Sequence, residues 1–406
     1  MIPLLSILIA TKNRQKYCLS AVESILMLPD TNIQVIVQDN SDDTNLIDML
    51  THFLKDSRLI YRYTPPPFSS IDNFNAAIEL ATGEYVCLIG DDDGINPEII
   101  TATAWAKENN IDCLVGNLKA NYRWENTGEK QFFHLKISSS SLVLGSFKGK
   151  AKLIDTKQSL ENLVQNGCTN YMDFAFPKLY HGIVKKEILE ELKFETGAYL
   201  KGLSPDIYAA IALAFKIKKF VTVDYPLSIP GVCTSSSSIQ EGEQKTNSKE
   251  LENAPHLRDR KEPYIWEINV PRIYCVQTIW ADSAFAAFKE FRQTELLKDF
   301  DKYMLCVKIL EADRSLEPMV FDFLVKTEPG LSLTQLRLKV RLTMLRGPYK
   351  KLIVKIFNRV KLILGLERFN VIENLPNIVL ATKSLEDFLQ STDINLLEEL
   401  NEIKKV

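Results

Sequence analysis

The amino-acid sequence predicts an α/β protein in which a doubly wound, mostly parallel sheet is flanked by helices and followed by a mainly helical C-terminal region. In the first hundred residues, short apolar runs alternate with stretches of helical spacing, a pattern typical of parallel sheets. Polar residues gather just after these runs, at the sheet edge where such folds bind their ligands. From residue 264 onwards nearly every segment has helical periodicity.

The apolar runs are short enough to be strands covered on both faces, and the segments between them have the spacing of amphipathic helices. We expect the following order: strand 4–10, helix 17–28, strand 33–37, helix 46–53, strand 59–63, helix 73–81 and strand 85–89. Further along we expect helices at 156–164, 185–192 and 205–217, a strand at 220–224, and long helices at 264–291 and 295–312. The part between 111 and 149 is less regular and gives no clear elements.

The composition excludes several classes of protein. A chain of 406 residues with 46% hydrophobic and 25% charged residues has an ordinary globular make-up, so wholesale disorder is excluded. The formal charge of −3 excludes a uniformly basic protein, and no nucleic-acid partner is expected. The seven cysteines form no C-x-x-C pair, and their odd number favours a reducing, cytoplasmic compartment.

We expect three regions along the chain. Residues 1–232 form the ligand-binding α/β domain. Residues 233–262 are polar and Ser-rich without any period, so they are either a mobile lid or a plain linker. Residues 263–406 form the helical region, whose long helices are also candidates for pairing between two chains.

Three consecutive aspartates, Asp91, Asp92 and Asp93, follow the strand at 85–89. Carboxylates packed so closely repel one another unless a cation or hydrogen-bond donors neutralise them. A hard divalent ion such as Mg²⁺ or Mn²⁺, shared with substrate phosphates, is the natural partner. The alternative is that acidic residues simply favour a turn before a helix.

Two further polar groups follow the neighbouring strands. Asp39 ends the second strand, where a carboxylate can accept hydrogen bonds from a base or ribose, although for Asp39 taken alone an Asx turn is the favoured explanation. Thr11, Asn13 and Arg14 occupy the loop after the first strand. Polar donors with one arginine suit a nucleotide diphosphate, and an ordinary loop is the alternative.

Taken together, the segments SILIATKNR, VIVQDNSDD, NFNAAIELATGEYVCLIGDDD and the following NPE resemble glycosyltransferase family 2, the nucleotide-sugar transferases of GT-A fold. The resemblance covers roughly residues 3–237 and implies a GT-A-type sheet. It implies that Asp39 and Thr11 hold the nucleotide base, and that Asn73 and Asn75 line the donor site. It also implies that the aspartate triplet holds the metal. Many members have D-x-D where this chain has G-D-D-D, so which two aspartates bind the metal is open, with Asp92 favoured by its spacing to Pro97.

The resemblance also implies a general base in the second half of the domain. Asp206 is the candidate, because a glycine precedes it and a PLS-x-x-G strand follows it. An acid in the first turn of a helix is also explained by the helix dipole alone. His181 precedes a helix and is a candidate for the acceptor side, although a lone histidine is more often a packing residue.

Residues 335–368 form a basic amphipathic segment. From Arg337 to Arg368 there are ten basic residues and a single acid, interleaved with aliphatic side chains. Such a segment suits an anionic membrane surface, and a helix covering the catalytic domain is the alternative. We therefore expect a peripheral protein at the inner face of the cell membrane.

These features predict an inverting, Mn²⁺- or Mg²⁺-dependent glycosyltransferase that moves a sugar from a nucleotide-diphosphate sugar to a hydroxyl of a glycan or lipid-linked acceptor. Bacterial surface polysaccharide synthesis is the expected setting. One alternative is a nucleotidyltransferase, which the lack of glycine in ATKNRQKYC disfavours. The other is a non-catalytic, membrane-docked scaffold, which the intact aspartates disfavour.

Overall fold

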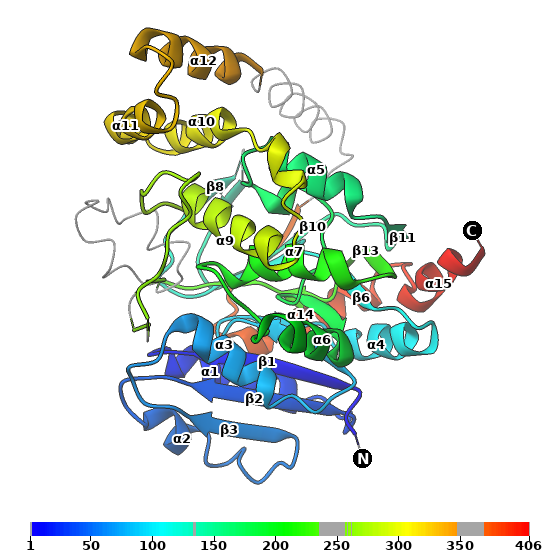
Figure 1. Ribbon diagram of the computed structural model, residues 1–406. Helices are drawn as coiled ribbons and strands as arrows, with labels where there is room; N and C mark the ends of the chain where they lie inside the picture. The colour runs from blue at the N-terminus through cyan, green and yellow to red at the C-terminus, as the bar shows by residue number, and fades with distance from the viewer. Residues whose placement is uncertain are drawn as a thin grey trace.

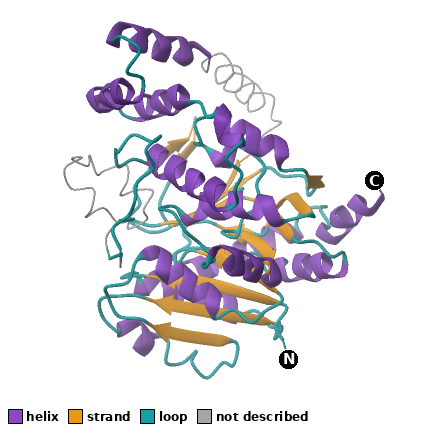
Figure 2. Cartoon of the chain, in the orientation of Figure 1, coloured by secondary structure: helices purple, strands orange, loops and turns teal. Residues whose placement is uncertain are grey.

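Figure 1 shows the computed structural model, which describes residues 2–132, 135–234, 256–257, 259–260, 262–346 and 369–405. Most of the predicted linker at 233–262 and the second half of the predicted basic segment, 347–368, lie outside the described residues. Helices lie on both sides of the strands (Figure 2).

The centre of the fold is an eight-stranded mixed sheet with the order β11-β13-β6-β12-β4-β1-β2-β3. Its first half is parallel throughout and contains the four predicted strands: β1 (Leu5–Thr11), β2 (Ile33–Asp39), β3 (Leu59–Tyr63) and β4 (Tyr85–Ile89). The chain leaves β1 towards β2 and β3, then returns to β4 on the other side of β1. This reversal is the point at which open α/β sheets bind ligands. The predicted α/β fold class is confirmed.

The second half of the sheet is mixed. Strand β12 (Gly182–Lys185) runs antiparallel to both β4 and β6 (Cys113–Asn117), and β13 (Phe220–Pro226) runs parallel to β6. Strand β11 (Ala151–Ile154) closes the edge, antiparallel to β13. Because β12 brings the chain back beside β4, residues just before it lie next to the aspartate turn.

The irregular part between 111 and 149 contains strands that the sequence pattern did not reveal. A four-stranded sheet has the order β15-β7-β10-β16 and draws its strands from distant parts of the chain. Its members are β7 (Ala120–Arg123), β10 (Ser141–Gly145), β15 (Gly231–Val232) and β16 (Phe369–Ile372). Two small pairings, β5 (Gly94–Ile95) with β14 (Ser228–Ile229) and β8 (Lys130–Phe132) with β9 (Leu135–Ile137), complete the strands.

The helices of the N-terminal part agree with the predicted positions to within a few residues, except that the second is shorter and that α4 has no counterpart among the predicted ranges. They are α1 (Gln15–Leu26), α2 (Asn45–Met49), α3 (Ser70–Glu79), α4 (Ile99–Glu108), α5 (Lys157–Gln165), α6 (Lys186–Thr196) and α7 (Pro205–Lys216). Helix α3 begins where the Ser69 side chain accepts a hydrogen bond from the Asp72 amide.

The C-terminal region is helical, but the prediction of one helix over 264–291 is wrong for its first part. Residues 262–275 form turns and extended chain, and α9 begins only at Val276 (Val276–Glu290). Pro263 and Pro271 explain the difference, since proline lacks an amide proton and disfavours helix in the residue before it. The other helices are α10 (Lys302–Ala312), α11 (Glu317–Thr327), α12 (Leu333–Arg346), α14 (Ile378–Gln390) and α15 (Leu396–Asn401).

The hydrophobic core continues from the sheet into the C-terminal helices. One cluster of buried residues runs from Leu8 and Val86 in the sheet through Ile211 of α7 and Phe288 of α9 to Leu336 of α12. The cluster on the other face includes Ile378 of α14 and Leu400 of α15. Each face of the sheet is therefore completed by C-terminal residues. None of the described helices is long and apolar enough to cross a membrane.

Candidate active site

The carboxyl ends of β1 and β4 bring Thr11, Arg14 and the first two aspartates together. The Thr11 hydroxyl donates to Asp91 Oδ2 at 2.6 Å. The Arg14 guanidinium lies between two carboxylates, with Nη1 2.8 Å from Asp91 Oδ1 and Nη2 2.7 Å from Asp92 Oδ2. Both carboxylates are almost completely buried. The predicted contact between these two strand ends is therefore present.

Asp91 and Asp92 together carry more negative charge than Arg14 alone can balance. Burial raises the pKa of Asp91 and the charge of Asp92 raises it further, while Arg14 opposes both effects. The same two carboxylates hold the pKa of Arg14 above its ordinary value despite its burial. Two buried carboxylates that share one arginine form a site that attracts further positive charge.

Asp93 has a different role from its two neighbours. Its Oδ1 accepts from the Gly231 amide at 2.6 Å, and its Oδ2 accepts from the Gly90 amide at 2.6 Å and from the Tyr180 hydroxyl at 3.0 Å. His181 Nε2 lies 3.3 Å from the same Oδ2. With both oxygens used by donors from three chain segments, Asp93 fixes the shape of the turn and does not fit a metal ligand.

The predicted metal is therefore tested by the fit of Asp91 and Asp92 alone. Carboxylate oxygens are the ligands that Mg²⁺ and Mn²⁺ prefer, and such ions often take only one or two carboxylates beside substrate phosphates. Among the described residues there is no group of three His, Cys, Asp or Glu side chains that could hold a metal ion by itself. Asp91 and Asp92 fit a divalent ion whose remaining ligands come from a substrate.

Asp39 lies at the end of β2, level with Thr11 in the sheet register. Its Oδ1 accepts from the Ser41 amide at 2.8 Å, which is the Asx turn that the alternative interpretation names. Its Oδ2 accepts from the Tyr61 hydroxyl at 2.8 Å. Asn13 links the loops after β1 and β2, since its side chain exchanges hydrogen bonds with Asp42. Both residues shape the edge where a nucleotide base is expected.

The two asparagines of α3 face different neighbours. Asn73 Nδ2 donates to the Thr11 carbonyl at 3.2 Å, and its buried Oδ1 has no partner among the described residues. Asn75 exchanges hydrogen bonds with the backbone of Leu200, at 3.0 and 2.9 Å. Asn73 therefore borders the predicted donor site, and its Oδ1 can accept a hydrogen bond from a ligand there. Asn75 instead holds the loop that precedes α7.

His181 is brought to the aspartate turn by backbone pairing with β4, where its amide donates to the Leu88 carbonyl. It is buried at φ 60°, a left-handed conformation uncommon for a non-glycine residue. Burial, helped by Lys178, lowers its pKa to about 3, so the ring is neutral at pH 7. Its Nδ1 has no partner within the described part of the chain. Such strain and an orphaned buried atom are common at functional sites.

Asp206 lies in the first turn of α7 with its side chain partly exposed. Burial raises its pKa to about 6, and the charge of Lys178 partly opposes this. The side chain forms no hydrogen bond or ion pair within the described residues. Burial raises the pKa of Tyr180, and the charges of Asp93, Asp92 and Asp206 raise it further, so this tyrosine lies within electrostatic range of both the aspartate turn and Asp206.

The loop before α7 is held by the C-terminal region. Ser283 Oγ of α9 accepts from the amides of Leu203 at 2.9 Å and Ser204 at 2.8 Å. Gly202 has φ 76°, and a Cβ there would lie 3.0 Å from Ser283. The Ser204 side chain, at the N-terminus of α7, makes no capping hydrogen bond. Helix α9 therefore sets the position from which Asp206 projects.

Tyr180, Trp124 and Ser283 were not found from the sequence, and Gly231 was noted only as the last residue of the PLS-x-x-G strand. Trp124 Nε1 donates to the Asp92 carbonyl at 2.8 Å, and Gly231 packs against the same carbonyl. These residues lie in segments whose contact with the aspartate turn depends on strand pairing across the chain. Only Tyr180 had a local signal, because it adjoins His181.

Gly231→Ala is expected to damage the aspartate turn, since a Cβ at this position would lie 1.8 Å from the Asp92 backbone oxygen. Overpacking against backbone typically costs about 1–3 kcal/mol or more, because the backbone must move. Urea denaturation should show a lower free energy of unfolding. Gly330→Ala is the matched control, because nothing lies within 4 Å of a Cβ there. An unchanged unfolding midpoint for Gly231→Ala would contradict the close contact.

Comparison with known sequences identifies the family of the N-terminal part of the chain. Residues 6–169 match the family described as glycosyl transferase family 2. This part of the chain is a glycosyltransferase family 2 domain.

Individual relatives are distant. Glycosyltransferase GlyG of Streptococcus pneumoniae is 23% identical over 199 residues, which are 48% of this chain and 62% of that protein. The GalNAc(5)-diNAcBac-PP-undecaprenol beta-1,3-glucosyltransferase of Campylobacter jejuni is 25% identical over 174 residues, 39% of this chain and 54% of that protein. The chain thus spans less than two thirds of either relative. Among solved structures, S. aureus TarS 1-349 in complex with UDP-GlcNAc has a TM-score of 0.46 at 15% identity, covering 84% of this chain and 89% of TarS 1-349.

Proposed function

We propose that the protein is a metal-dependent, inverting glycosyltransferase that moves a sugar from a nucleotide-diphosphate sugar to a hydroxyl of a glycan or lipid-linked acceptor. The observation that carries the proposal is the pairing of two buried carboxylates, Asp91 and Asp92, with the separate carboxylate of the half-buried residue Asp206. The first two suit a cation and a diphosphate, and the third suits proton removal. Polysaccharide synthesis is the setting that the named relatives support.

In the proposed reaction the acceptor oxygen attacks the anomeric carbon while the bond from that carbon to the diphosphate oxygen breaks. The hydroxyl proton passes to Asp206, whose pKa of about 6 leaves it mostly ionised at pH 7 yet basic enough to accept the proton. Arg14 and Lys12, both in the loop after β1, bring positive charge to the leaving diphosphate. A divalent ion held by Asp91 and Asp92 would neutralise the same leaving group.

The direct test is a panel of nucleotide sugars assayed for transfer to water or to a glycan acceptor, with Mn²⁺ and with a chelator. We expect one sugar nucleotide to be consumed only with the metal present. The same nucleotide should raise the melting temperature, because a ligand at 100 times its Kd stabilises the folded state by about 2.7 kcal/mol. Metal-independent consumption, or no stabilisation by any member, would contradict the proposal.

A peripheral position at the inner face of the membrane is part of the proposal, and α12 supports it. The described leucines Leu338, Leu342 and Leu345 are 56%, 51% and 61% exposed, and their spacing places them on one side of the helix. Exposed basic residues, Arg337 and Arg341, flank them. Aliphatic side chains between cations are typical of helices that lie on anionic membranes.

Sedimentation with vesicles should therefore bring down the full-length protein when phosphatidylglycerol is present and not with phosphatidylcholine alone. Binding should weaken as salt rises, since surface charges are screened within about 10 Å at 0.1 M. Leu338→Glu with Leu342→Glu should reduce the bound fraction, while Leu153→Glu, at a similarly exposed leucine of β11, should not. If vesicle binding did not depend on salt, or if Leu153→Glu lowered the bound fraction as much as the α12 variant, the proposed membrane contact would be wrong.

A further inference from the structure

Two adjacent residues from the C-terminal part of the chain, Asp259 and Arg260, contact two loops of the candidate site. Asp259 Oδ2 lies 3.3 Å from Lys12 Nζ, in the loop after β1. Arg260 Nη2 donates to the Gly202 carbonyl at 2.7 Å, in the loop before α7. A C-terminal residue therefore brings a carboxylate to the edge of the sheet where the donor diphosphate is proposed to bind.

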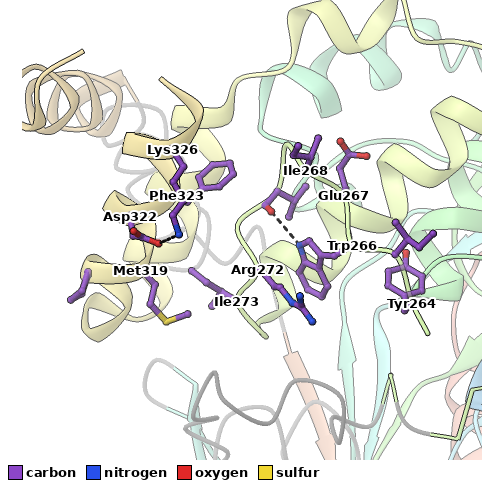
Figure 3. A pocket seen from close by; sticks show the side chains of 13 residues that line it. Tyr264, Trp266, Glu267, Ile268, Arg272, Ile273, Met319, Asp322, Phe323 and Lys326 are labelled. Atoms are coloured by element: carbon purple, nitrogen blue, oxygen red, sulfur yellow. Dashed lines mark hydrogen bonds and ion pairs between the residues drawn. The ribbon is translucent and has the colours of Figure 1, made fainter. Parts of the chain in front are cut away.

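Arg260 is anchored by the elements around it. Its Nε donates to the His256 carbonyl at 3.0 Å, and its guanidinium carbon lies 4.7 Å from the centre of the Tyr264 ring. Tyr264 lines a groove of about 790 Å³ between the segment 264–273 and α11 (Figure 3), and its hydroxyl donates to Asp282 of α9. The anchoring of Arg260 keeps the neighbouring residue, Asp259, close to the loop after β1.

The two cations of the loop after β1 differ in how easily a ligand can reach them. Arg14 is shared by the buried carboxylates of Asp91 and Asp92. Lys12 has Asp259 as its single ion-pair partner among the described residues, and these two side chains are 27% and 31% exposed. Lys12 is therefore the cation of this loop that an incoming phosphate can reach from solvent.

The Asp259 carboxylate occupies the Lys12 ammonium in the way that a phosphate would. Carboxylate and phosphate are both anions that accept charge-assisted hydrogen bonds, and a lysine binds either one as a point charge. Because Asp259 belongs to the same chain, it competes at a high effective concentration that dilution does not lower. A phosphate oxygen that binds Lys12 must displace this carboxylate or share the ammonium with it.

We propose, on the basis of the proposed transferase function, that Asp259 is an internal competitor of the donor diphosphate for Lys12. The contact is autoinhibitory, because the diphosphate gains the lysine only by displacing the carboxylate. Donor affinity is thereby limited by a residue that does not itself bind the donor.

The test is calorimetric titration of the full-length protein with UDP, GDP, ADP and dTDP, with Mn²⁺ and at low salt. Asp259→Asn should bind the preferred nucleotide about two- to fivefold more tightly than wild type, the range expected when a partly exposed ion pair is lost. Lys12→Met should bind it about tenfold more weakly. Asp259→Asn added to Lys12→Met should give no gain, because the ammonium for which the two anions compete is missing.

The salt dependence of nucleotide binding provides a second measurement. In Asp259→Asn, Lys12 lacks its internal counter-charge, so nucleotide affinity should fall more steeply with salt than in wild type. Glu262→Gln is the matched control, because it removes one negative charge from an exposed side chain three residues away that has no hydrogen bond or ion pair within the described residues. This control should leave the affinity and its salt dependence unchanged.

The opposite results are equally specific. Weaker binding in Asp259→Asn would show that the carboxylate orients Lys12 for the ligand, and unchanged binding would show that the ion pair does not compete; either would overturn the inference. A gain that persists without Lys12, or an equal gain in Glu262→Gln, would reveal a general charge effect and overturn it as well. Wild-type protein that consumes a sugar nucleotide with an affinity independent of Asp259 would refute the inference alone. Wild-type protein that binds none of the four nucleotides would contradict the proposed transferase function too.

Discussion

Asp206→Asn is expected to lower the transfer rate by about 10²–10⁴-fold while the affinity for the sugar nucleotide stays unchanged. Asparagine keeps the size of the side chain but cannot take the acceptor proton. The partly exposed carboxylate contacts no donor-side residue through a hydrogen bond in the described structure, so donor binding has no reason to change. Single-turnover kinetics with a saturating donor, together with calorimetry of donor binding, measure the two quantities separately.

The pH profile gives an independent check on the base. Because the pKa of Asp206 is about 6, kcat/KM in the wild type should fall as pH drops below 6, and this limb should disappear in the variant's residual activity. Folding raises this pKa above its ordinary value of 3.8, so ionisation of Asp206 weakens stability as pH rises from about 4 to 6. Asp206→Asn should therefore be no less stable than wild type at pH 7.5.

The control is Asp48→Asn, which removes the first-turn acid of α2 without touching the site. It should leave both kinetics and donor affinity at wild-type values. If Asp206→Asn lost donor affinity and stability together, the residue would be acting on the helix terminus, as the dipole alternative states.

Asp92→Asn is expected to reduce Mn²⁺-dependent donor binding and turnover by at least about 10²-fold, because it removes one of the two carboxylates and leaves Asp91, already bound to Arg14 and Thr11, as the remaining one. Calorimetric titration of Mn²⁺ with a nucleoside diphosphate present measures the loss. Wild-type metal affinity in Asp92→Asn would show that the metal assignment is wrong.

Asp93→Asn is the internal comparison for this prediction. It removes the charge from a side chain that accepts from Gly90, Gly231 and Tyr180, so it should lower stability by about 1–3 kcal/mol. Its Mn²⁺ affinity should fall far less than that of Asp92→Asn. An equal loss of Mn²⁺ affinity in the two variants would show that Asp93 is also a metal ligand.

The parallel half of the sheet could be predicted because its strands are continuous apolar runs whose ends carry the polar residues. Because the ends of parallel strands meet at one edge of the sheet, Thr11 and Asp91 could be expected close together although they are eighty residues apart in the sequence. The different roles of the three aspartates could not be predicted. They depend on which way each carboxylate points, and that is fixed by Gly231 and Tyr180, which arrive through pairing that the sequence does not reveal.

The structure of the C-terminal region could also be predicted only in part from the sequence. Helical spacing alone predicted that the helix containing Ala281 begins at residue 264. Prolines at 263 and 271 prevent a helix there, so that residues 264–273 line a groove beside α11 instead. The role of Asn75 in holding Leu200 was equally hidden, because a side chain that binds a distant backbone leaves no periodic pattern.

The two hydrogen bonds that Ser283 Oγ accepts from the amides of Leu203 and Ser204 have an evolutionary consequence. A lineage that exchanged its C-terminal helices for others would also disturb the position of Asp206, the proposed base. Helix α9 and the helix that carries the proposed base are therefore expected to be inherited as one unit. Recombination between relatives would preserve activity only where the crossover keeps α7 and α9 from the same parent.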